Sequence, residues 1–77
     1  MDEVVIENRV KLARVEQGLT QNELAVAIGV TRQTIGLIEA GKYNPSLKIC
    51  LLIAQTTHKT LDQLFWIKGT EHEPLNR

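Results

Sequence analysis

Apolar residues recur at helical spacing in several short segments of the chain. Val10 and Ala13 lie on one face of the first segment, and Leu24 and Ile28 lie one turn apart in the second. Each segment is bounded by residues that commonly begin or end helices. The pattern predicts five short helices, at about residues 8–17, between Thr20 and Gly29, and at about residues 32–40, 47–57 and 61–65.

The residues at the predicted helix ends specify these boundaries. Thr20 and Glu23 have the form of a capping box, in which each side chain accepts a hydrogen bond from the other residue's backbone N–H, and Thr60 and Gln63 repeat this form. The other signals are two N-cap residues, Thr31 and Ser46, and three glycines suited to the left-handed conformation after a helix, Gly18, Gly29 and Gly41.

The two ends of the chain admit two interpretations. Residues 4–6 and 65–67 are both rich in side chains that favour strands, so they can pair as a small antiparallel β-ribbon. Alternatively, residues 4–6 extend the first helix and the tail frays. In either case we expect a single domain, residues 1–77, with a core at residues 8–65 and a C-terminal strand or tail at residues 66–77.

The composition fits one small folded domain without a cofactor. The chain has 77 residues, of which 43% are hydrophobic, and a domain this small is marginally stable without a disulfide, a metal or a partner subunit. Cys50 is the single cysteine, and His58 and His72 lack metal-ligand spacing, so we expect no disulfide, metal or small-molecule ligand. No secretory leader or membrane-spanning stretch is recognisable, which favours a cytoplasmic protein that does not contact membranes.

The net charge of zero hides an uneven distribution of charge. Residues 8–60 contain seven Lys and Arg side chains and three Glu side chains, a net charge of +4, whereas the remaining residues carry −4. A basic middle with acidic ends is compatible with a nucleic-acid partner despite the neutral total.

Residues 21–40 meet the requirements of a helix-turn-helix unit. Ala25 is small enough to let two helices approach, and Gly29 can adopt the positive φ that the turn needs. The apolar positions expected to lock the two helices together are Leu24, Ile28, Val30, Ile35 and Ile38. No single position is specific, but their joint spacing predicts this motif.

The stretch LTQNELAVAIGVTRQTIGLIEAGKYNPS, residues 19–46, resembles the DNA-binding domain of the Cro/cI-type (Xre) helix-turn-helix family. The resemblance extends over about residues 8–65 and implies an all-α, five-helix fold of the lambda-repressor type, with the third helix in the DNA major groove. The segment RQTI…GKYNPSL is similar to small bacterial regulators that add a terminal β-ribbon and act as homodimers. Residues 56–59 depart from the family pattern, in which apolar residues and a glycine are more common.

The resemblance implies which residues contact DNA. Base-facing positions are occupied by Thr31, Arg32, Gln33 and Leu37, and Gln21 falls at a phosphate-binding position. Arg32 can pair with guanine O6 and N7, and Gln33 can pair with adenine N6 and N7. The other expected phosphate contacts are two hydroxyls near helix starts, Thr20 and Thr34, and the loop after the third helix, Lys42, Tyr43 and Asn44.

Two of these positions, Leu37 and Tyr43, and the neighbouring Gly36 admit a second interpretation. Leu37 can touch a thymine methyl group or can be an ordinary exposed leucine. Gly36 costs a helix about 1 kcal/mol relative to Ala, so it either permits close approach of the backbone to DNA or occupies a weakly constrained surface position. Tyr43 can pack its ring in a solvated turn and still present its hydroxyl.

The resemblance also implies that Arg14 and Glu39 form a partly buried ion pair. Arg14 is then not a full phosphate ligand, and Glu39 is a scaffold residue rather than an acid catalyst. The sequence contains no paired carboxylates, supported nucleophile or glycine-rich phosphate loop, and Cys50 lies in an apolar segment typical of a core thiol. We therefore do not expect an enzyme.

The predicted fourth helix is apolar on nearly all sides, because Lys48 and Gln55 are the only polar residues between positions 47 and 55. A domain of this size covers only one side of such a helix, so we expect the other side to form a dimer interface. The alternative is a wide core within one subunit that leaves one or two apolar residues exposed. The expected interface residues are Ile49, Leu52, Leu61, Phe65 and Trp66. Two-fold symmetry would place two recognition helices about 34 Å apart on a palindromic operator.

Taken together, these features predict a sequence-specific, homodimeric DNA-binding regulator that acts as a repressor. The alternative is a protein-interaction module on the same scaffold, such as an antitoxin or an antirepressor. The neutral total charge and the acidic tail favour this alternative, whereas Arg32 and Gln33 at base-reading positions favour DNA.

Overall fold

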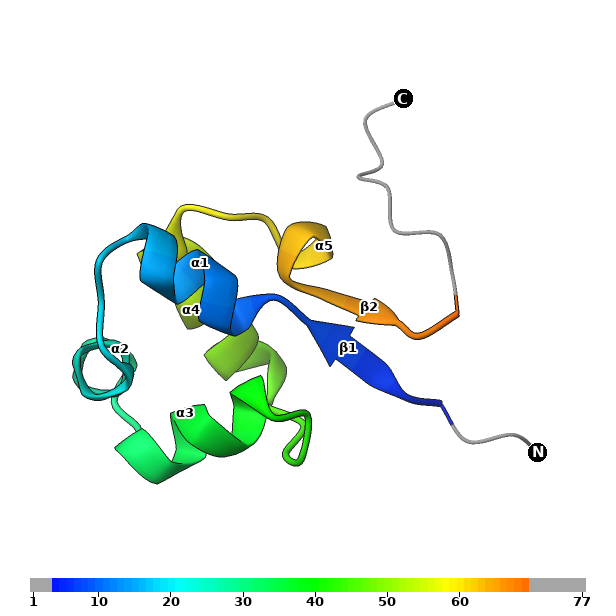
Figure 1. The fold of residues 1–77 in the computed structure, drawn as a ribbon, viewed down its shortest axis with the longest axis horizontal. Coiled ribbons are helices and arrows are strands. Elements are labelled where there is room, and N and C mark those ends of the chain that lie inside the picture. Colours follow the sequence, from blue (N-terminus) through cyan, green and yellow to red (C-terminus); the bar gives the residue numbers. More distant parts are fainter. Residues whose placement is uncertain (1–3, 70–77) are drawn as a thin grey trace.

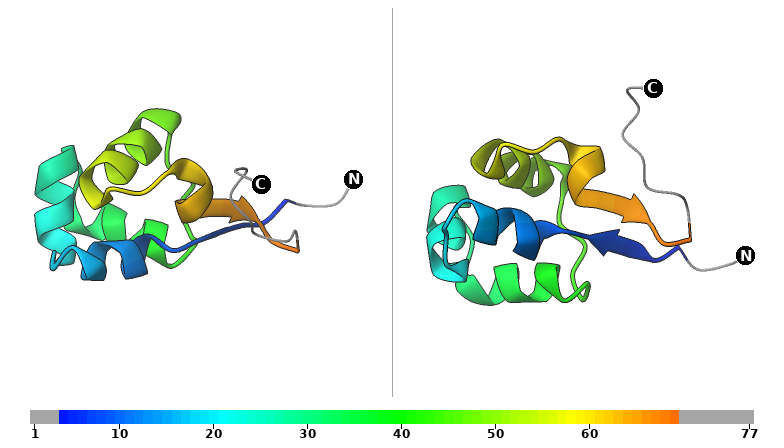
Figure 2. Two further views of the ribbon diagram at one scale, coloured as in Figure 1. Left: turned by 90° about the horizontal axis from the view of Figure 1, so that it is seen from above. Right: turned by 45° about the horizontal axis from the view of Figure 1, so that its top comes forward.

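The computed structural model describes residues 4–69, which contain five helices and two short strands (Figure 1). In chain order the elements are β1 (Ile6–Asn8), α1 (Val10–Glu16), α2 (Gln21–Ile28), α3 (Arg32–Glu39), α4 (Leu47–Thr57), α5 (Leu61–Leu64) and β2 (Phe65–Ile67). The predicted five-helix fold class is therefore confirmed. α3 and α5 lie on opposite sides of the helical body, and the ribbon of β1 and β2 lies at the end away from α2 (Figure 2). None of the helices within residues 4–69 has the length and hydropathy needed to cross a membrane.

The boundaries of α2 follow its capping residues. The Thr20 hydroxyl accepts a hydrogen bond from the Glu23 N–H at 3.0 Å, and the Glu23 carboxylate accepts one from the Thr20 N–H at 2.8 Å. The predicted capping box is therefore confirmed. Gly29 ends the helix with a φ of 81°, a left-handed conformation that a residue with a side chain adopts only with strain.

α4 keeps its predicted bounds even though residues 56–59 depart from the family pattern. The Ser46 hydroxyl accepts from the Ile49 N–H at 3.3 Å and caps its start. His58 ends the helix with a φ of 58°, and within residues 4–69 it is the only residue other than glycine with a positive φ. The hydroxyl of the fully buried Thr57 donates to the Ile53 carbonyl at 2.8 Å, so this polar side chain is satisfied inside the core.

The β-ribbon is confirmed, but its first strand begins later than predicted. β1 and β2 are antiparallel, with Ile6 opposite Ile67 and Asn8 opposite Phe65. The strand thus covers Ile6–Asn8 rather than residues 4–6, and the alternative in which residues 4–6 extend α1 is wrong. α5 is one residue shorter than predicted because Phe65 begins β2.

Asn8 determines where β1 ends and α1 begins. Its side-chain oxygen accepts from the Val10 N–H at 3.0 Å, and its side-chain nitrogen donates to the Ile38 carbonyl at 3.0 Å. The sequence pattern predicts Asn8 inside the first helix, which is wrong, because Ile38 lies thirty positions away and has no effect on a local pattern. One side chain therefore connects the ribbon, α1 and the last turn of α3.

The core is built from all five helices. The buried hydrophobic residues are Val10, Ala13, Leu24, Ala25, Ile28, Ile35, Ile38, Ile53, Ala54 and Leu64. These include the predicted inward residues of α2 and α3, and Ala25 is 1% exposed where the sequence required a small side chain. Val30, between α2 and α3, is partly buried and packs against this cluster.

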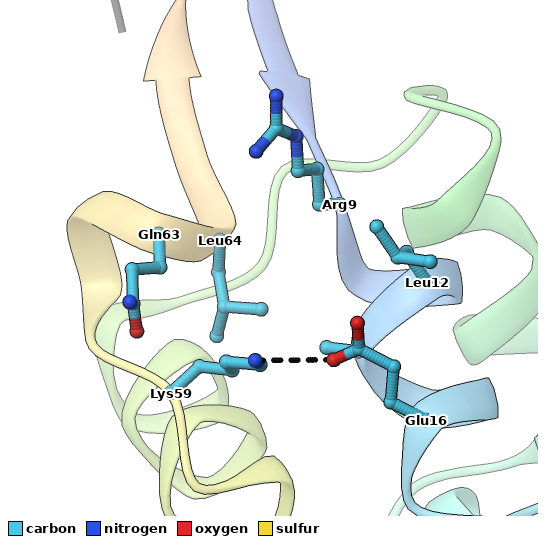
Figure 3. A pocket seen from close by; sticks show the side chains of 7 residues that line it. Arg9, Leu12, Glu16, Lys59, Gln63 and Leu64 are labelled. Atoms are coloured by element: carbon cyan, nitrogen blue, oxygen red, sulfur yellow. Dashed lines mark ion pairs between the residues drawn. The ribbon is translucent and has the colours of Figure 1, made fainter. Parts of the chain in front are cut away.

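An open cavity of about 240 Å³ lies between α1 and the segment around α5 (Figure 3). Its lining residues are Arg9, Leu12, Ala13, Glu16, Lys59, Gln63 and Leu64. Lys59 and Glu16 form an ion pair across it at 3.0 Å, and both side chains are about a third or more exposed. Residues 4–69 contain no cluster of His, Cys, Asp and Glu side chains that can hold a metal ion.

Replacing Asn8 with Ala should lower the free energy of unfolding by about 1–2 kcal/mol, because two partly buried hydrogen bonds are lost. Urea denaturation monitored by circular dichroism measures this difference. Asn22→Ala, at an exposed position of α2, is the matched control and should change stability by no more than about 0.5 kcal/mol. Equal stabilities of the two variants would contradict the role assigned to Asn8.

Candidate nucleic-acid interface

α3 is attached to the core by one face and is accessible on the other. Ile35 is 0% exposed and Ile38 is 1% exposed, so both side chains are fully inserted into the core. The accessible positions of α3 and its N-cap include all four predicted base contacts, Thr31, Arg32, Gln33 and Leu37. A helix anchored in this way can present its outer side chains to a groove without losing its own packing.

Thr31 and Thr34 form a local pair at the start of α3. The Thr31 hydroxyl accepts from the Thr34 N–H at 3.2 Å, and the two hydroxyl oxygens are 3.0 Å apart. Two hydroxyls joined by one hydrogen bond retain one O–H donor between them. The pair can therefore cap the helix and still donate to a phosphate oxygen.

The start of α2 offers backbone and side-chain donors. The Thr20 N–H is already bonded to Glu23, so Thr20 contributes its hydroxyl rather than its backbone to any ligand. The N–H groups of Gln21 and Asn22 belong to the first turn and have no carbonyl partner within the helix. These donors lie at the positive end of the helix dipole, which attracts anions.

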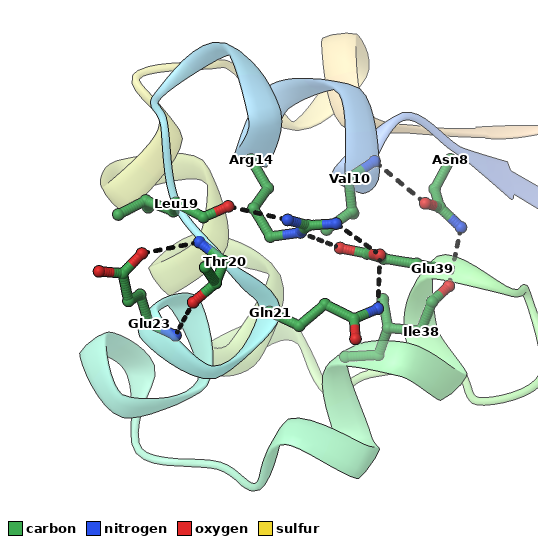
Figure 4. A network of polar contacts seen from close by, with 9 residues as sticks. All are labelled: Asn8, Val10, Arg14, Leu19, Thr20, Gln21, Glu23, Ile38 and Glu39. Atoms are coloured by element: carbon green, nitrogen blue, oxygen red, sulfur yellow. Dashed lines mark hydrogen bonds and ion pairs between the residues drawn. The ribbon is translucent and has the colours of Figure 1, made fainter.

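Arg14, Gln21 and Glu39 meet between α1, α2 and α3 (Figure 4). The Arg14 Nε atom lies 2.7 Å from Glu39 Oε2, and the two side chains are 10% and 5% exposed. Arg14 also donates to Glu39 Oε1 at 3.3 Å and to the Leu19 carbonyl at 2.8 Å. Gln21 Nε2 donates to the same Glu39 Oε1 at 3.1 Å. The structure thus joins the expected ion pair to an expected phosphate contact, a link that the sequence did not indicate.

The loop after α3 contains three predicted phosphate contacts, and all three are exposed: Lys42, Tyr43 and Asn44. The Lys42 N–H bonds back to the Leu37 carbonyl at 2.9 Å, and Gly41 turns the chain with a φ of 73°. Tyr43 is 47% exposed, so part of its ring is covered. The loop is therefore held to the end of α3 by its backbone while its side chains remain accessible.

Gly36 lies on α3 where the helix faces the Gln21 side chain. A Cβ atom built at Gly36 would lie 3.9 Å from Gln21 Nε2, an ordinary van der Waals distance. The fold therefore does not require glycine at this position, and the helix accepts an alanine without a clash.

The five predicted dimer-interface residues do not form the most exposed apolar surface. Ile49, Leu52, Leu61 and Phe65 are partly buried and pack against the core. The Trp66 ring lies 5.1 Å from the Arg9 guanidinium, and its Nε1 donates to a Glu7 carboxylate oxygen at 3.2 Å. The exposed apolar pair on α4 is instead Leu47 and Leu51, which are 65% and 50% exposed. Their spacing of four residues places them on one face of the helix.

Cys50 has the environment of a structural thiol. It is partly buried in α4, and burial raises the pKa of its thiol, opposed by a weaker backbone hydrogen bond. A raised pKa keeps the sulfur protonated at neutral pH, which makes it a poor nucleophile.

Comparison with known proteins places this arrangement among regulators. A family model described as Helix-turn-helix matches residues 10–64. An uncharacterized HTH-type transcriptional regulator of Archaeoglobus fulgidus is 44% identical over 57 residues, which cover 74% of this chain and 81% of that protein. Another, from Methanocaldococcus jannaschii, is 43% identical over 66 residues, covering 86% of this chain and 100% of that protein.

A solved structure has the same fold. The restriction-modification controller protein C.AhdI from Aeromonas hydrophila is 30% identical to this chain, with a TM-score of 0.65 over 70% of this chain and 82% of that one. The matched residues of the family model, 10–64, contain the Arg14–Glu39 pair, α2, α3 and the loop after α3, but they end just before β2.

Gly36→Ala should raise the free energy of unfolding by about 1 kcal/mol, because alanine is the better helix former and its Cβ meets no close atom. Gly29→Ala is the contrasting control. It should lower stability by about 1 kcal/mol, since alanine at a φ of 81° is strained although space is open. Thermal unfolding of both variants measures the difference, and a destabilised Gly36→Ala variant would show that α3 is packed more tightly around Gly36 than the 3.9 Å distance indicates.

Proposed function

Since the chain belongs to the helix-turn-helix family of transcriptional regulators, we propose that it represses transcription by binding a palindromic DNA operator as a homodimer, with α3 in the major groove. The observation that carries this proposal is the exposure of Arg32 and Gln33 on the first turn of a helix that two buried isoleucines anchor. The family is not enzymatic, and the relatives are named as transcriptional regulators.

The base-reading chemistry follows from the exposed side chains of α3. The planar Arg32 guanidinium matches the two acceptors of guanine, and the Gln33 amide matches the donor and acceptor of adenine. Each such bidentate pair discriminates its base by about 1–3 kcal/mol. Leu37, which is 39% exposed, supplies an apolar surface one turn further along for a thymine methyl group, and the Thr31 hydroxyl lies at the start of the helix.

Phosphate groups would be held on both sides of α3. On one side lie the donors of Thr20 and Gln21 at the start of α2. The Thr34 hydroxyl lies in the first turn of α3, beside the Thr31 hydroxyl. On the other side, the loop with Lys42, Tyr43 and Asn44 supplies one cation and two neutral donors. Contacts of this kind fix the position of a protein on the duplex, and the +4 net charge of residues 8–60 supports them electrostatically.

The proposed dimer uses α4. Leu47 and Leu51 are two exposed leucines on one face, flanked by the partly buried Ile49 and Leu52. A second copy that covers this face would remove apolar surface from water and strengthen a domain too small to bury a large core. Two-fold symmetry would then pair two α3 helices about one turn of DNA, about 34 Å, apart, which matches a palindromic operator.

The Arg32→Ala, Gln33→Ala double variant should lose operator discrimination and keep its fold. Selection of bound fragments from random DNA with the wild-type protein first identifies the operator, and fluorescence anisotropy then compares the operator with a scrambled duplex. We expect the ratio of the two affinities to fall by about tenfold or more, because two bidentate contacts are lost. Lys11→Ala, which also removes one exposed positive charge, should leave the ratio unchanged.

Undiminished discrimination by the double variant would refute the role of α3. Binding that does not weaken with salt would favour the protein-interaction alternative.

Leu51→Glu should shift the protein towards the monomer, because a charge would be placed in the proposed apolar interface. Sedimentation equilibrium at micromolar concentration measures the change. Leu12→Glu is a matched control, since Leu12 lies on α1 and is 54% exposed compared with 50% for Leu51. The proposal for α4 fails if wild type is already monomeric, or if the two variants dissociate equally.

A further inference from the structure

We infer that Glu39 is a positioning residue for DNA binding, because it holds the Gln21 side chain at the start of α2 in the orientation that a phosphate requires. This inference rests on the proposed DNA-binding function and extends it to a residue that does not itself touch DNA. It assigns to the Arg14–Glu39 pair a second role beyond joining α1 to α3.

The geometry shows that Gln21 is tied to the ion pair. Gln21 Nε2 donates to Glu39 Oε1 at 3.1 Å, and Glu39 Oε1 also accepts from Arg14 at 3.3 Å. Glu39 Oε2 is engaged by Arg14 Nε at 2.7 Å, so neither carboxylate oxygen is left to rotate freely. The Arg14 guanidinium is itself fixed by the Leu19 carbonyl at 2.8 Å. The Gln21 amide is therefore the outermost group of a chain of contacts that begins in the core (Figure 4).

The chemistry of the amide leaves a donor for a ligand. A glutamine side chain has two N–H donors, and Glu39 uses one of them. Gln21 is also the first residue of α2, so its backbone N–H has no partner within the helix. One residue can thus present a side-chain N–H and a backbone N–H to the same phosphate group.

Holding the side chain before binding favours the complex. A free glutamine side chain loses rotamer entropy when it becomes ordered. Because Glu39 already restricts the Gln21 amide in the free protein, less of this entropy is lost when DNA binds.

The charge of Glu39 is compatible with a phosphate only because Arg14 neutralises it. A single carboxylate near a phosphate would repel it, whereas the paired carboxylate accepts two donors from Arg14 and acts as a fixed acceptor. This is why the contact from Gln21 is expected to depend on the acceptor oxygen at position 39 and not on its charge.

The experiment compares two backgrounds, of which only one keeps an acceptor oxygen at position 39. Removing Glu39 alone would leave the buried Arg14 unpaired and can unfold the protein, so both partners are changed together. Arg14→Met with Glu39→Met gives an apolar pair without an acceptor, and Arg14→Met with Glu39→Gln gives a neutral pair that retains an acceptor oxygen for Gln21. Thermal unfolding verifies the fold of each, and Gln21→Ala is then added to wild type and to both backgrounds.

Binding to a labelled, random-sequence DNA duplex in low salt is the measurement, because phosphate contacts do not depend on sequence. Gln21→Ala should weaken binding by about tenfold in wild type and in the background with Glu39→Gln, the size of one hydrogen bond from a neutral donor to a charged phosphate, and should have less than about a twofold effect with Glu39→Met. Gln17→Ala, at the residue just after α1, removes a glutamine that donates to the Thr57 carbonyl at 3.3 Å and is a control that should not change DNA binding in any background.

The results separate this inference from the proposed function. If wild type binds the duplex and Gln21→Ala weakens it equally in all three backgrounds, or in none, the positioning role of Glu39 is wrong and the proposed function stands. If wild type does not bind DNA at all, the proposed function fails, and this inference fails with it.

Discussion

The orientation of α3 depends on the buried ion pair between Arg14 and Glu39. α3 has eight residues, fewer than an isolated helix needs to be stable in water, and only two of its side chains are fully buried. Ile35 and Ile38 hold the helix against the core, but apolar contacts are not directional and define its rotation about its own axis less strictly than hydrogen bonds do. Glu39 fixes that rotation by bonding to Arg14 on α1, and Asn8 fixes the last turn through the Ile38 carbonyl. The presentation of the outer face of α3 therefore follows from polar contacts made on its inner side.

A buried ion pair is a demanding way to fix a helix, because each charge loses its hydration. The pair is favourable here only because its hydrogen-bonding groups are satisfied: both carboxylate oxygens and three guanidinium nitrogens have partners. Replacing it with apolar side chains can preserve stability, yet apolar side chains specify direction less well than a two-pronged guanidinium. The pair is thus better explained by the geometry it imposes on α1, α2 and α3 than by net stability.

Local signals in the sequence are enough to predict that each of the five helices exists, but they do not predict features that depend on contacts between distant residues. Thr20, Ser46 and the glycines act within one turn of their helices, so their effect can be seen in a short window of sequence. The start of α1 could not be placed in this way, because Asn8 is held by a carbonyl thirty residues away. The outward face of α4 was also unpredictable in detail, since a helix that is apolar all round has no periodicity to show which leucines stay exposed.

The same distinction applies to the candidate site. The resemblance to a known family indicated which positions face DNA, and the exposure of Thr31, Arg32 and Gln33 agrees with that assignment. It treated Gln21 and the ion pair as separate features, whereas the structure joins them through one carboxylate oxygen. A phosphate contact at the start of α2 and base contacts on α3 then share a support in the core. If both are used, a shift of α3 relative to α2 would disturb phosphate and base contacts together, so affinity and specificity in this protein would not be independent properties.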